Sequence, residues 1–354
     1  MKKATITLAA LLAAAPAARA AQVPATAAAP APTREFEIRN GRAFLGGHEI
    51  KIWGIRAANG LMSRAVTERF IRNLDNMAAH GINAILVYIM GSNTGWPEEW
   101  AARNGFERDG RLKPAFAERL EWLIREADKR GMVVGVGIFT PRNAGNMDGE
   151  DALKRALTET GSFLKERGLR NVFADIMHEY NHRRVVPDIF KEPGGAEKKA
   201  RLRAWLKEAN PAVEAGVTAT IDRGTDPSFP GADFACLQKT MPIPENPSGG
   251  FTMNVETHKR DNYDSDGVYT EKGLAEQRGW FEDYRKRPNT GLFLHAAWLT
   301  GVTGRSGTAP NAEMGGAGTP DDPGVRFYYE WVRENVGRWQ YPRHVPVSTT
   351  TGRK

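Results

Sequence analysis

The chain has 354 residues, of which 41% are hydrophobic and 26% charged, and it contains 9 Trp, 15 Phe and 8 Tyr. This composition supports a sizeable core and excludes an intrinsically disordered chain and a small domain stapled by disulfides. The formal charge of +7 includes Lys2, Lys3 and Arg19, and it falls to +4 when residues 1–20 are removed. That excess is too weak to predict a nucleic-acid-binding protein.

The N-terminus has the pattern of an export signal. Lys2 and Lys3 precede an apolar run from Ala4 to Ala15, and Ala18-Arg19-Ala20 is a small-x-small cleavage site. The run is too short to span a bilayer, and no later segment is long and apolar enough for a membrane helix. We therefore expect a signal peptide over residues 1–20 and a periplasmic or secreted mature protein with no integral membrane segment.

One large domain should follow a short linker. Residues 21–33 are rich in Ala and Pro and uncharged, which is typical of a disordered spacer, and we expect folding to begin near Phe36. Residues 34–345 form the expected domain, and residues 346–354 a tail. The single cysteine, Cys236, excludes an intramolecular disulfide and lies in an apolar stretch, so we expect a buried small hydrophobe and no nucleophile.

The domain alternates apolar β-like runs with amphipathic helical runs. Apolar residues recur at helical spacing between the strands, and Gly81, Gly131 and Gly168 each end a helix before the next strand. Eight such units predict a (β/α)8 TIM barrel of the α/β class, with a short N-terminal β-hairpin (36–43, then 44–49) below it. An open doubly wound sheet is the alternative, although no Gly-rich phosphate turn follows the first strand. The predicted strands are 50–55, 84–90, 132–139, 172–177, 215–221, 234–238, 252–256 and 292–298.

Polar side chains are dense where these strands end. In a TIM barrel the catalytic groups lie at the carboxyl ends of the strands, so this density favours an enzyme. The residues that we expect at the barrel mouth are Arg56, Tyr88, His178, Glu179, Asn181, Arg223, Lys239, Glu256, His258, His295 and Trp298.

Two of these residues are carboxylates on opposite sides of the predicted mouth. Glu179 follows the fourth strand and Glu256 ends the seventh. Hydrolysis of a glycosidic bond needs one carboxyl group to protonate the leaving oxygen and a second to attack or to activate water. We predict this chemistry, with the two carboxyl groups about 5 to 5.5 Å apart for a retaining mechanism, whereas roughly 6.5 to 9.5 Å would indicate inversion.

The sequence resembles the cellulase-like retaining glycoside hydrolases (family 5-like), a group of (β/α)8 enzymes. The matching pieces are Trp53-Gly54-Ile55-Arg56, Gly81-Ile82-Asn83, Glu179, Asn254-Val255-Glu256-Thr257 and Trp298. The resemblance implies that Glu179 is the acid/base, that Glu256 is the nucleophile and that Trp298 stacks on a sugar. The family usually has Asn before the acid/base, and here that position is His178, which can donate the same hydrogen bond. The other mouth residues are then substrate-binding, with no metal and no cofactor.

Three other functions compete with this one. His178-Glu179-Tyr180-Asn181-His182 matches H-E-x-x-H, the zinc metalloprotease pattern, which requires a helix through the motif where the sequence predicts the end of a strand. A polysaccharide lyase would use Tyr88, His178 or Lys239 as a base. A non-catalytic carbohydrate-binding barrel would keep the aromatic and Arg residues without needing either Glu.

The predicted mouth is also rich in Arg and Lys side chains. We therefore expect the substrate to be an acidic polysaccharide, one that carries uronic acid or sulfate. The basic residues at or beyond the strand ends are Arg56, Arg142, Arg183, Arg184, Arg223, Lys239, Lys259, Arg260 and Arg305.

Overall fold

The computed structural model describes residues 30–91, 104–141, 143–182, 187, 189, 195–220, 231–238, 250–257, 260–296, 309–312 and 316–347. The chain divides into two compact units, Met1–Ala31 and Pro32–Lys354. All the described helices and strands belong to the second unit. None of these helices is long and apolar enough to cross a membrane.

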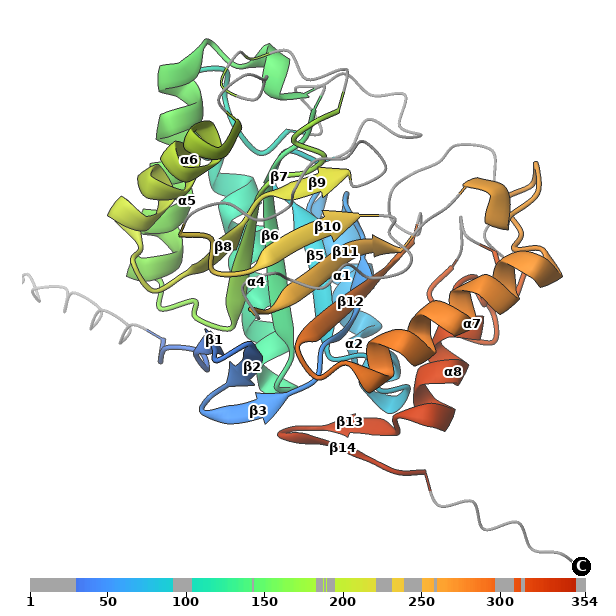
Figure 1. Ribbon diagram of the computed structural model, residues 1–354. Coiled ribbons are helices and arrows are strands. Elements are labelled where there is room, and N and C mark those ends of the chain that lie inside the picture. The colour runs from blue at the N-terminus through green and yellow to red at the C-terminus, as the bar shows by residue number, and fades with distance from the viewer. Residues whose placement is uncertain are drawn as a thin grey trace, which may run out of the picture. The chain divides into compact units, whose positions relative to one another are not determined.

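A nine-stranded parallel sheet forms the centre of this unit, and Figure 1 shows it curling into a barrel with helices outside. Its order is β8-β7-β6-β5-β4-β12-β11-β10-β9. The two edge strands, β8 and β9, are separated in sequence only by Val217, so they are two halves of one barrel strand. The predicted TIM barrel is therefore confirmed. Its strands are β4 (Trp53–Arg56), β5 (Ala84–Tyr88), β6 (Val133–Phe139), β7 (Val172–Met177), β8 (Glu214–Gly216), β9 (Thr218–Thr220), β10 (Ala235–Gln238), β11 (Thr252–Thr257) and β12 (Thr290–His295).

The interruption at Val217 was not predicted, because residues 215–221 have the composition of one continuous strand. Next to the break, a Cβ on Gly216 would lie 2.6 Å from the Phe234 ring, so the glycine leaves room for that ring. Beyond the break, Asp175 Oδ1 accepts a hydrogen bond from the backbone N of Thr218 at 3.3 Å. The backbone N of Tyr180 donates to the Thr218 carbonyl at 2.8 Å. The backbone hydrogen bonds between β7 and β8 stop at the break. From there, the Asp175 side chain and the turn that contains Tyr180 connect β7 to β9.

The helices follow the apolar periodicity, and one such run is divided in two. Val66, Phe70, Leu74 and Met77 have the spacing of one continuous helix, but the structure ends one helix at Arg72 and starts the next at Leu74. Gly81, Gly131 and Gly168 have φ values of 85°, 62° and 63°, the left-handed conformation expected where helices end. The helices are α1 (Arg64–Arg72), α2 (Leu74–Ala79), α4 (Pro114–Lys129), α5 (Glu150–Glu166), α6 (Gly195–Ala209), α7 (Glu271–Lys286) and α8 (Arg326–Asn335), with 3-10 turns η1 (Asn143–Asn146) and η4 (Arg260–Asn262).

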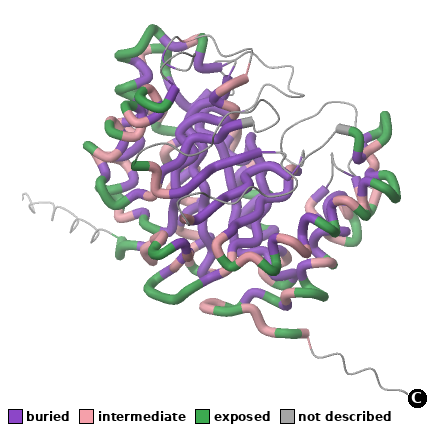
Figure 2. Tube along the Cα trace, viewed as in Figure 1, coloured by how far each residue is buried: buried purple, intermediate pink, exposed green. Residues whose placement is uncertain are grey.

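Aromatic rings fill the lower part of the barrel interior. Phe173 lies 5.7 Å from both Phe234 and Phe293, measured between ring centroids. Gly54 makes room for this packing, since a Cβ there would lie 2.3 Å from Phe293. The barrel strands are buried along almost their whole length (Figure 2). Cys236 belongs to this core, as predicted.

Two small antiparallel sheets lie below the barrel in Figure 1. The predicted hairpin is a three-stranded sheet of β1 (Phe36–Arg39), β2 (Arg42–Leu45) and β3 (His48–Ile50). Near the other end of the chain, β13 (Arg338–Gln340) pairs with β14 (Arg343–Val345). The amino-terminal end of the barrel is called the floor here. The term includes the residues that contact one another at this end, 33–34, 128–131, 168–171 and 339–344.

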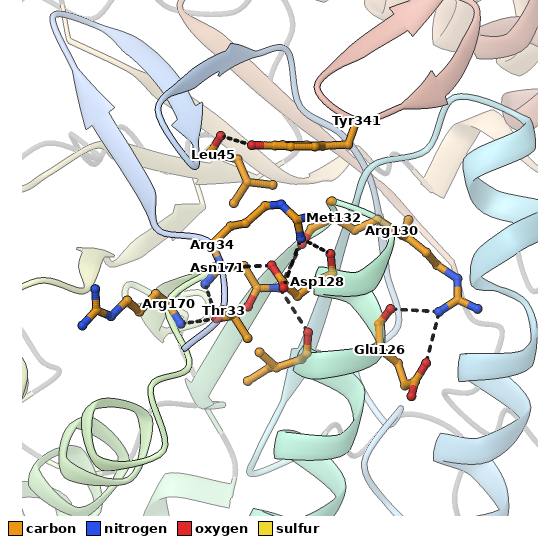
Figure 3. Close-up of polar contacts among 12 residues, drawn as sticks. Thr33, Arg34, Leu45, Glu126, Asp128, Arg130, Met132, Arg170, Asn171 and Tyr341 are labelled. Carbon is orange, nitrogen blue, oxygen red and sulfur yellow. Dashed lines mark hydrogen bonds and ion pairs between the residues drawn. The ribbon is translucent and has the colours of Figure 1, made fainter. Parts of the chain in front are cut away.

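The chain is anchored to the floor from Thr33 onward, earlier than the expected start near Phe36. Thr33 Oγ1 accepts hydrogen bonds from the backbone N of Arg170 at 2.6 Å and of Asn171 at 3.2 Å. Arg34 pairs with Asp128 at 3.1 Å, and its guanidinium lies 4.6 Å from the ring centre of Tyr341. Figure 3 shows these contacts converging at the end of α4, around Asp128. Both ends of the described chain therefore meet at the floor.

Candidate active site

Seven of the predicted site residues are described, and they come from strands on several sides of the barrel or the turns that follow them: Arg56, Tyr88, His178, Glu179, Asn181, Glu256 and His295. The other four, Arg223, Lys239, His258 and Trp298, lie outside the described residues.

Glu256 is the centre of the described site. Its Oε2 lies 3.0 Å from Arg56 Nη1 and 3.2 Å from His178 Nε2. Its Oε1 accepts a hydrogen bond from Gln238 Nε2 at 3.1 Å. These partners come from β4, the turn after β7, and β10, so the barrel brings together residues up to 200 positions apart in sequence. Both carboxylate oxygens are thereby fixed in direction.

The surroundings of Glu256 keep it ionised. Its side chain is 7% exposed, and burial alone would raise its pKa. The charge of Arg56, the electrostatic interactions with His295 and His178 and the hydrogen bond from His178 outweigh burial, so the pKa of Glu256 lies well below the ordinary value. A buried carboxylate that stays anionic and oriented is suited to nucleophilic attack.

Arg56 positions Glu256 and has little surface left for a ligand. Its side chain is 4% exposed, and Nη1 lies 2.9 Å from His295 Nδ1 as well as against Glu256. Its guanidinium carbon lies 5.1 Å from the centre of the Tyr88 ring. A substrate-binding role for Arg56 stays a prediction, and in this structure its guanidinium contacts Glu256, His295 and the Tyr88 ring. His295 is more open, with Nδ1 3.8 Å from Glu256 Oε1.

Tyr88 is also buried beneath the site. Its hydroxyl donates to Asp175 Oδ2 at 2.5 Å and lies 3.3 Å from His178 Nδ1. Burial and the negative charge of Asp175 raise its pKa well above the ordinary value, which makes it a poor base at neutral pH. The roles of substrate ligand and lyase base for Tyr88 stay predictions.

Asp175 is the site residue that the sequence prediction missed. It lies inside β7, and its side chain has no exposed surface. A signal was present, since Asp175 is the one charged residue in the apolar strand Val172-Phe173-Ala174-Asp175-Ile176-Met177. Charged groups are rarely fully buried without partners, so its position between apolar residues pointed to a polar contact in the barrel.

Glu179 begins the turn that follows β7. It has a φ of 49°, in the left-handed region that non-glycine residues seldom adopt, and its side chain is 17% exposed. Such strain recurs at functional sites, where the surrounding structure enforces it. Its Oε2 lies 3.9 Å from His182 Nε2, and its charge contributes to the raised pKa of Arg56. Glu179 is thus the more accessible of the two carboxylates, while their 5 to 5.5 Å separation stays a prediction.

The zinc protease alternative required a helix through His178 and His182. The structure has a turn from His178 to Asn181, in which the His182 backbone N bonds the Glu179 carbonyl at 2.8 Å. His178 faces Glu256, whereas His182 faces Glu179. The two imidazoles therefore do not share one helical face, and the arrangement that H-E-x-x-H signifies is absent from this turn. Asn181 belongs to the same turn and is partly exposed.

Comparisons with known proteins find similar folds but no similar sequence. No protein-family model matches the chain, and no curated protein matches it. Solved structures do match, at low identity. A putative glycoside hydrolase from Bacteroides vulgatus has a TM-score of 0.56 and 13% identity over 74% of this chain and 55% of its own, so the chain spans about half of that protein.

Two further matches come from a mussel and from the same bacterium. The β-mannanase of the blue mussel Mytilus edulis has a TM-score of 0.54 and 12% identity, covering 86% of this chain and 97% of its own. A glycoside hydrolase family 5 protein from Bacteroides vulgatus has a TM-score of 0.52 and 13% identity, covering 77% of this chain and 65% of its own. The chain therefore has the (β/α)8 fold of the cellulase-like glycoside hydrolases, in a divergent form.

Proposed function

We propose that the protein is a retaining glycoside hydrolase in which Glu256 is the nucleophile and Glu179 the acid/base. The observation that carries this proposal is the environment of Glu256, an ionised carboxylate held by Arg56, His178 and Gln238 at the carboxyl end of β11. Glu179 lies on the turn after β7, and these two strand ends belong to different sides of the barrel. The likeness to solved glycoside hydrolases adds support through the fold.

The two carboxylates differ in the way that this mechanism requires. Glu256 attacks the anomeric carbon as an anion and forms a glycosyl ester, while the Glu179 carboxylic acid protonates the departing oxygen. Glu179, now a carboxylate, then takes a proton from water, and the water oxygen displaces Glu256. A strongly lowered pKa suits the first role, and the greater exposure of Glu179 suits a group that exchanges protons with substrate and water.

We further propose an acidic polysaccharide as the substrate. The support is the sequence, which puts nine Arg or Lys residues at or beyond predicted strand ends. Arg56 no longer counts among them, since it is paired with Glu256. Of the others, seven lie outside the described residues: Arg142, Arg183, Arg184, Arg223, Lys239, Lys259 and Arg305. Guanidinium groups bind carboxylate and sulfate at two points, which a neutral glycan does not offer.

Export completes the proposal, because a polymer of this kind is degraded outside the cytoplasm. Residues 1–20 carry the signal pattern with Ala18-Arg19-Ala20 as its cleavage site. Mass spectrometry of the protein from a bacterial periplasm or culture medium should give a chain that begins at Ala21. Recovery of the uncleaved chain from the cytoplasm alone would contradict this part.

A reducing-sugar assay over a panel of polysaccharides tests the activity. The panel should include uronic acid and sulfated polymers together with β-mannan and β-glucan as neutral comparators. Glu179→Gln and Glu256→Gln should each abolish most turnover, whereas Glu118→Gln, which alters an exposed ion pair with Arg64, should retain it. Retention of the anomeric configuration in the first product, followed by NMR, distinguishes the retaining from the inverting mechanism.

The same panel separates the competing functions. Binding without turnover by the wild type would indicate a carbohydrate-binding barrel, and product absorbance from a new double bond would indicate a lyase. Binding of an anionic polymer should weaken between low and physiological salt, where screening acts over about 8 to 10 Å. Faster, salt-independent turnover of a neutral β-glucan would overturn the proposed substrate charge and leave the hydrolase assignment standing.

A further inference from the structure

Asp175 is an ionisable group that the two-carboxylate mechanism does not use. Its side chain is completely buried in β7, and both of its oxygens have partners. Oδ1 accepts from the Thr218 backbone N at 3.3 Å, and Oδ2 accepts from the Tyr88 hydroxyl at 2.5 Å. Burying a carboxylate here costs free energy, and an apolar residue would continue the strand without that cost. Its contacts therefore indicate a role beyond packing.

The contacts of Asp175 continue without a gap to the proposed nucleophile. Tyr88 Oη lies 3.3 Å from His178 Nδ1, and the opposite ring nitrogen, Nε2, lies 3.2 Å from Glu256 Oε2. The Tyr88 and His178 rings meet edge to face at 5.5 Å, which fixes both planes. Asp175, Tyr88, His178 and Glu256 thus form one linear chain of polar contacts, which we call the buried relay.

The number of protons in the relay restricts its state. The Tyr88 hydroxyl has one proton, so it donates either to Asp175 or to His178 Nδ1. In the first arrangement, Asp175 is a carboxylate and His178 is a cation whose Nδ1–H donates to Tyr88. In the second, Asp175 is a carboxylic acid that donates to Tyr88, Tyr88 donates to Nδ1, and His178 is neutral. In both, Nε2–H donates to Glu256, and both contain the same number of protons.

We propose that Asp175 is a positioning residue that sets the charge of His178 through Tyr88, so that the cation next to Glu256 appears and disappears by proton movement inside the barrel. The Nδ1 proton of His178 passes to the Tyr88 oxygen while the Tyr88 proton passes to Asp175 Oδ2. No proton enters or leaves, and the net charge of the relay is unchanged. This inference rests on the proposed function only in giving Glu256 the role of nucleophile.

The charge on Glu256 decides between the two arrangements. While Glu256 is an anion, a cationic His178 stabilises it, and the 2.5 Å contact between Tyr88 and Asp175 is in the range of a charge-assisted O–H···O⁻ bond. When Glu256 becomes a neutral glycosyl ester, the cation loses its counter-charge, and the proton returns toward Asp175. Besides His178 and Tyr88, the groups that act on Asp175 are Arg56, the Thr218 backbone N–H and the thiol of Cys236. Burial raises the pKa of Asp175, and this favours its carboxylic acid form.

Histidine-selective NMR of the whole protein tests the relay without any substrate. The chain has seven His residues, and the resonances of His178 are assigned as those lost in His178→Gln. In the wild type at pH 7, both ring nitrogens of His178 should carry protons. In Asp175→Asn, which keeps the shape but provides no carboxylate, His178 should be neutral at the same pH. Tyr88→Phe, which breaks the link, should also change its protonation state.

The matched control is Tyr329→Phe, which removes a buried tyrosine hydroxyl on α8 away from the relay and should leave His178 unchanged. Thermal unfolding of every variant confirms that the compared proteins are folded. Identical His178 protonation in wild type, Asp175→Asn and Tyr88→Phe overturns the proposal.

Kinetics provide an independent readout once a substrate is known. Asp175→Asn should lower kcat roughly 10- to 100-fold with little change in KM, as for other partners that orient an active-site histidine, and should shift the pH profile. If no polysaccharide is cleaved but the NMR change is found, the proposed function fails and the relay stands. If hydrolysis is found and His178 does not respond to Asp175→Asn, the relay fails alone.

Discussion

The floor and the mouth of the barrel differ in what most of their polar side chains bond. At the floor, beside the ion pair of Arg34 with Asp128, Thr33, Tyr341 and His344 each bond backbone groups: Thr33 those of residues 168, 170 and 171, Tyr341 the carbonyl of Leu45, and His344 that of Gly81. At the mouth the contacts join side chains: Arg56 and His178 both contact Glu256, Arg56 also contacts His295, and Gln238 donates to Glu256.

This difference separates stability from chemistry. Backbone N–H and C=O groups are present whatever the sequence, and a side chain that bonds one of them satisfies its hydrogen-bonding need. Removal of that side chain therefore lowers the stability of the fold. A buried cluster of charged side chains is stable only when every member is present, and removal of one leaves another charge unpaired. We therefore expect floor variants to lower stability with normal turnover, and mouth variants to affect turnover first.

The largest effect should follow Glu256→Gln. Loss of the nucleophile should lower kcat/KM on the order of 10⁴-fold, and the unpaired buried charge of Arg56 should lower the free energy of unfolding by about 3 kcal/mol. Steady-state kinetics and urea unfolding measure the two effects. In Arg56→Met/Glu256→Gln, part of the stability should return and none of the activity. A double variant less stable than Glu256→Gln would contradict this account of the mouth.

The next effect belongs to the floor and depends on pH. Burial, opposed by the Gly81 hydrogen bond, lowers the pKa of His344 from 6.5 to about 4. Between those values the unfolded chain binds a proton that the folded chain does not, so this group destabilises the fold as pH falls from 6.5 to 4. Relative to His344→Gln, the wild type should lose about 2 kcal/mol between pH 7 and pH 4.5 in urea unfolding. Equal losses in the two proteins would show that His344 does not titrate in this window.

A smaller loss is expected for Thr33→Val, which removes the hydroxyl that accepts from Arg170 N and Asn171 N. Leaving these backbone groups without that acceptor should cost about 1 kcal/mol, with turnover per folded molecule unchanged. Thr158→Val, on the exposed surface of α5, is the matched control and should change stability by less than about 0.5 kcal/mol. A fall in kcat for Thr33→Val at unchanged stability would contradict the expectation that floor variants affect stability and leave turnover unchanged.

The smallest effect is a gain in stability at the mouth. Glu179 is strained at a φ of 49°, and Glu179→Gly relieves that strain while adding freedom to the unfolded chain. The net gain should be about 0.5 kcal/mol in urea unfolding, with activity lost. Glu179→Gln, which keeps the backbone strain, should be inactive without the gain. A less stable Glu179→Gly would mean that the side chain of Glu179 contributes more than its backbone costs.

The sequence predicted the barrel well because its signals are local. Apolar runs mark strands buried on both faces, and Gly81, Gly131 and Gly168 mark helix ends whose left-handed φ values are present in the structure. The strand over 172–177 has the predicted bounds. The break at Val217 was missed, because the run 215–221 has no Pro, Asn or Asp that would mark it.

Within the site, the sequence identified the residues at strand ends and missed how they are paired. Topology alone brings Glu256 and His178 to the mouth, so both were found. Arg56 pairs with Glu256, and Tyr88 donates a hydrogen bond to Asp175. Both contacts depend on distances between strands that no single stretch of sequence encodes. Asp175 was overlooked because its neighbours in sequence are apolar and its partners are all distant.

The described part of residues 34–345 begins and finishes at the floor. Arg34 and Tyr341 are in contact, so the first and last strands of this domain lie near one another. A circularly permuted version, with residues 34 and 345 joined by a short connector and new ends opened in an exposed floor-side turn such as Gly46-Gly47, would have the same barrel contacts in a different chain order. In such a protein the order of synthesis changes while the arrangement around Glu256 does not.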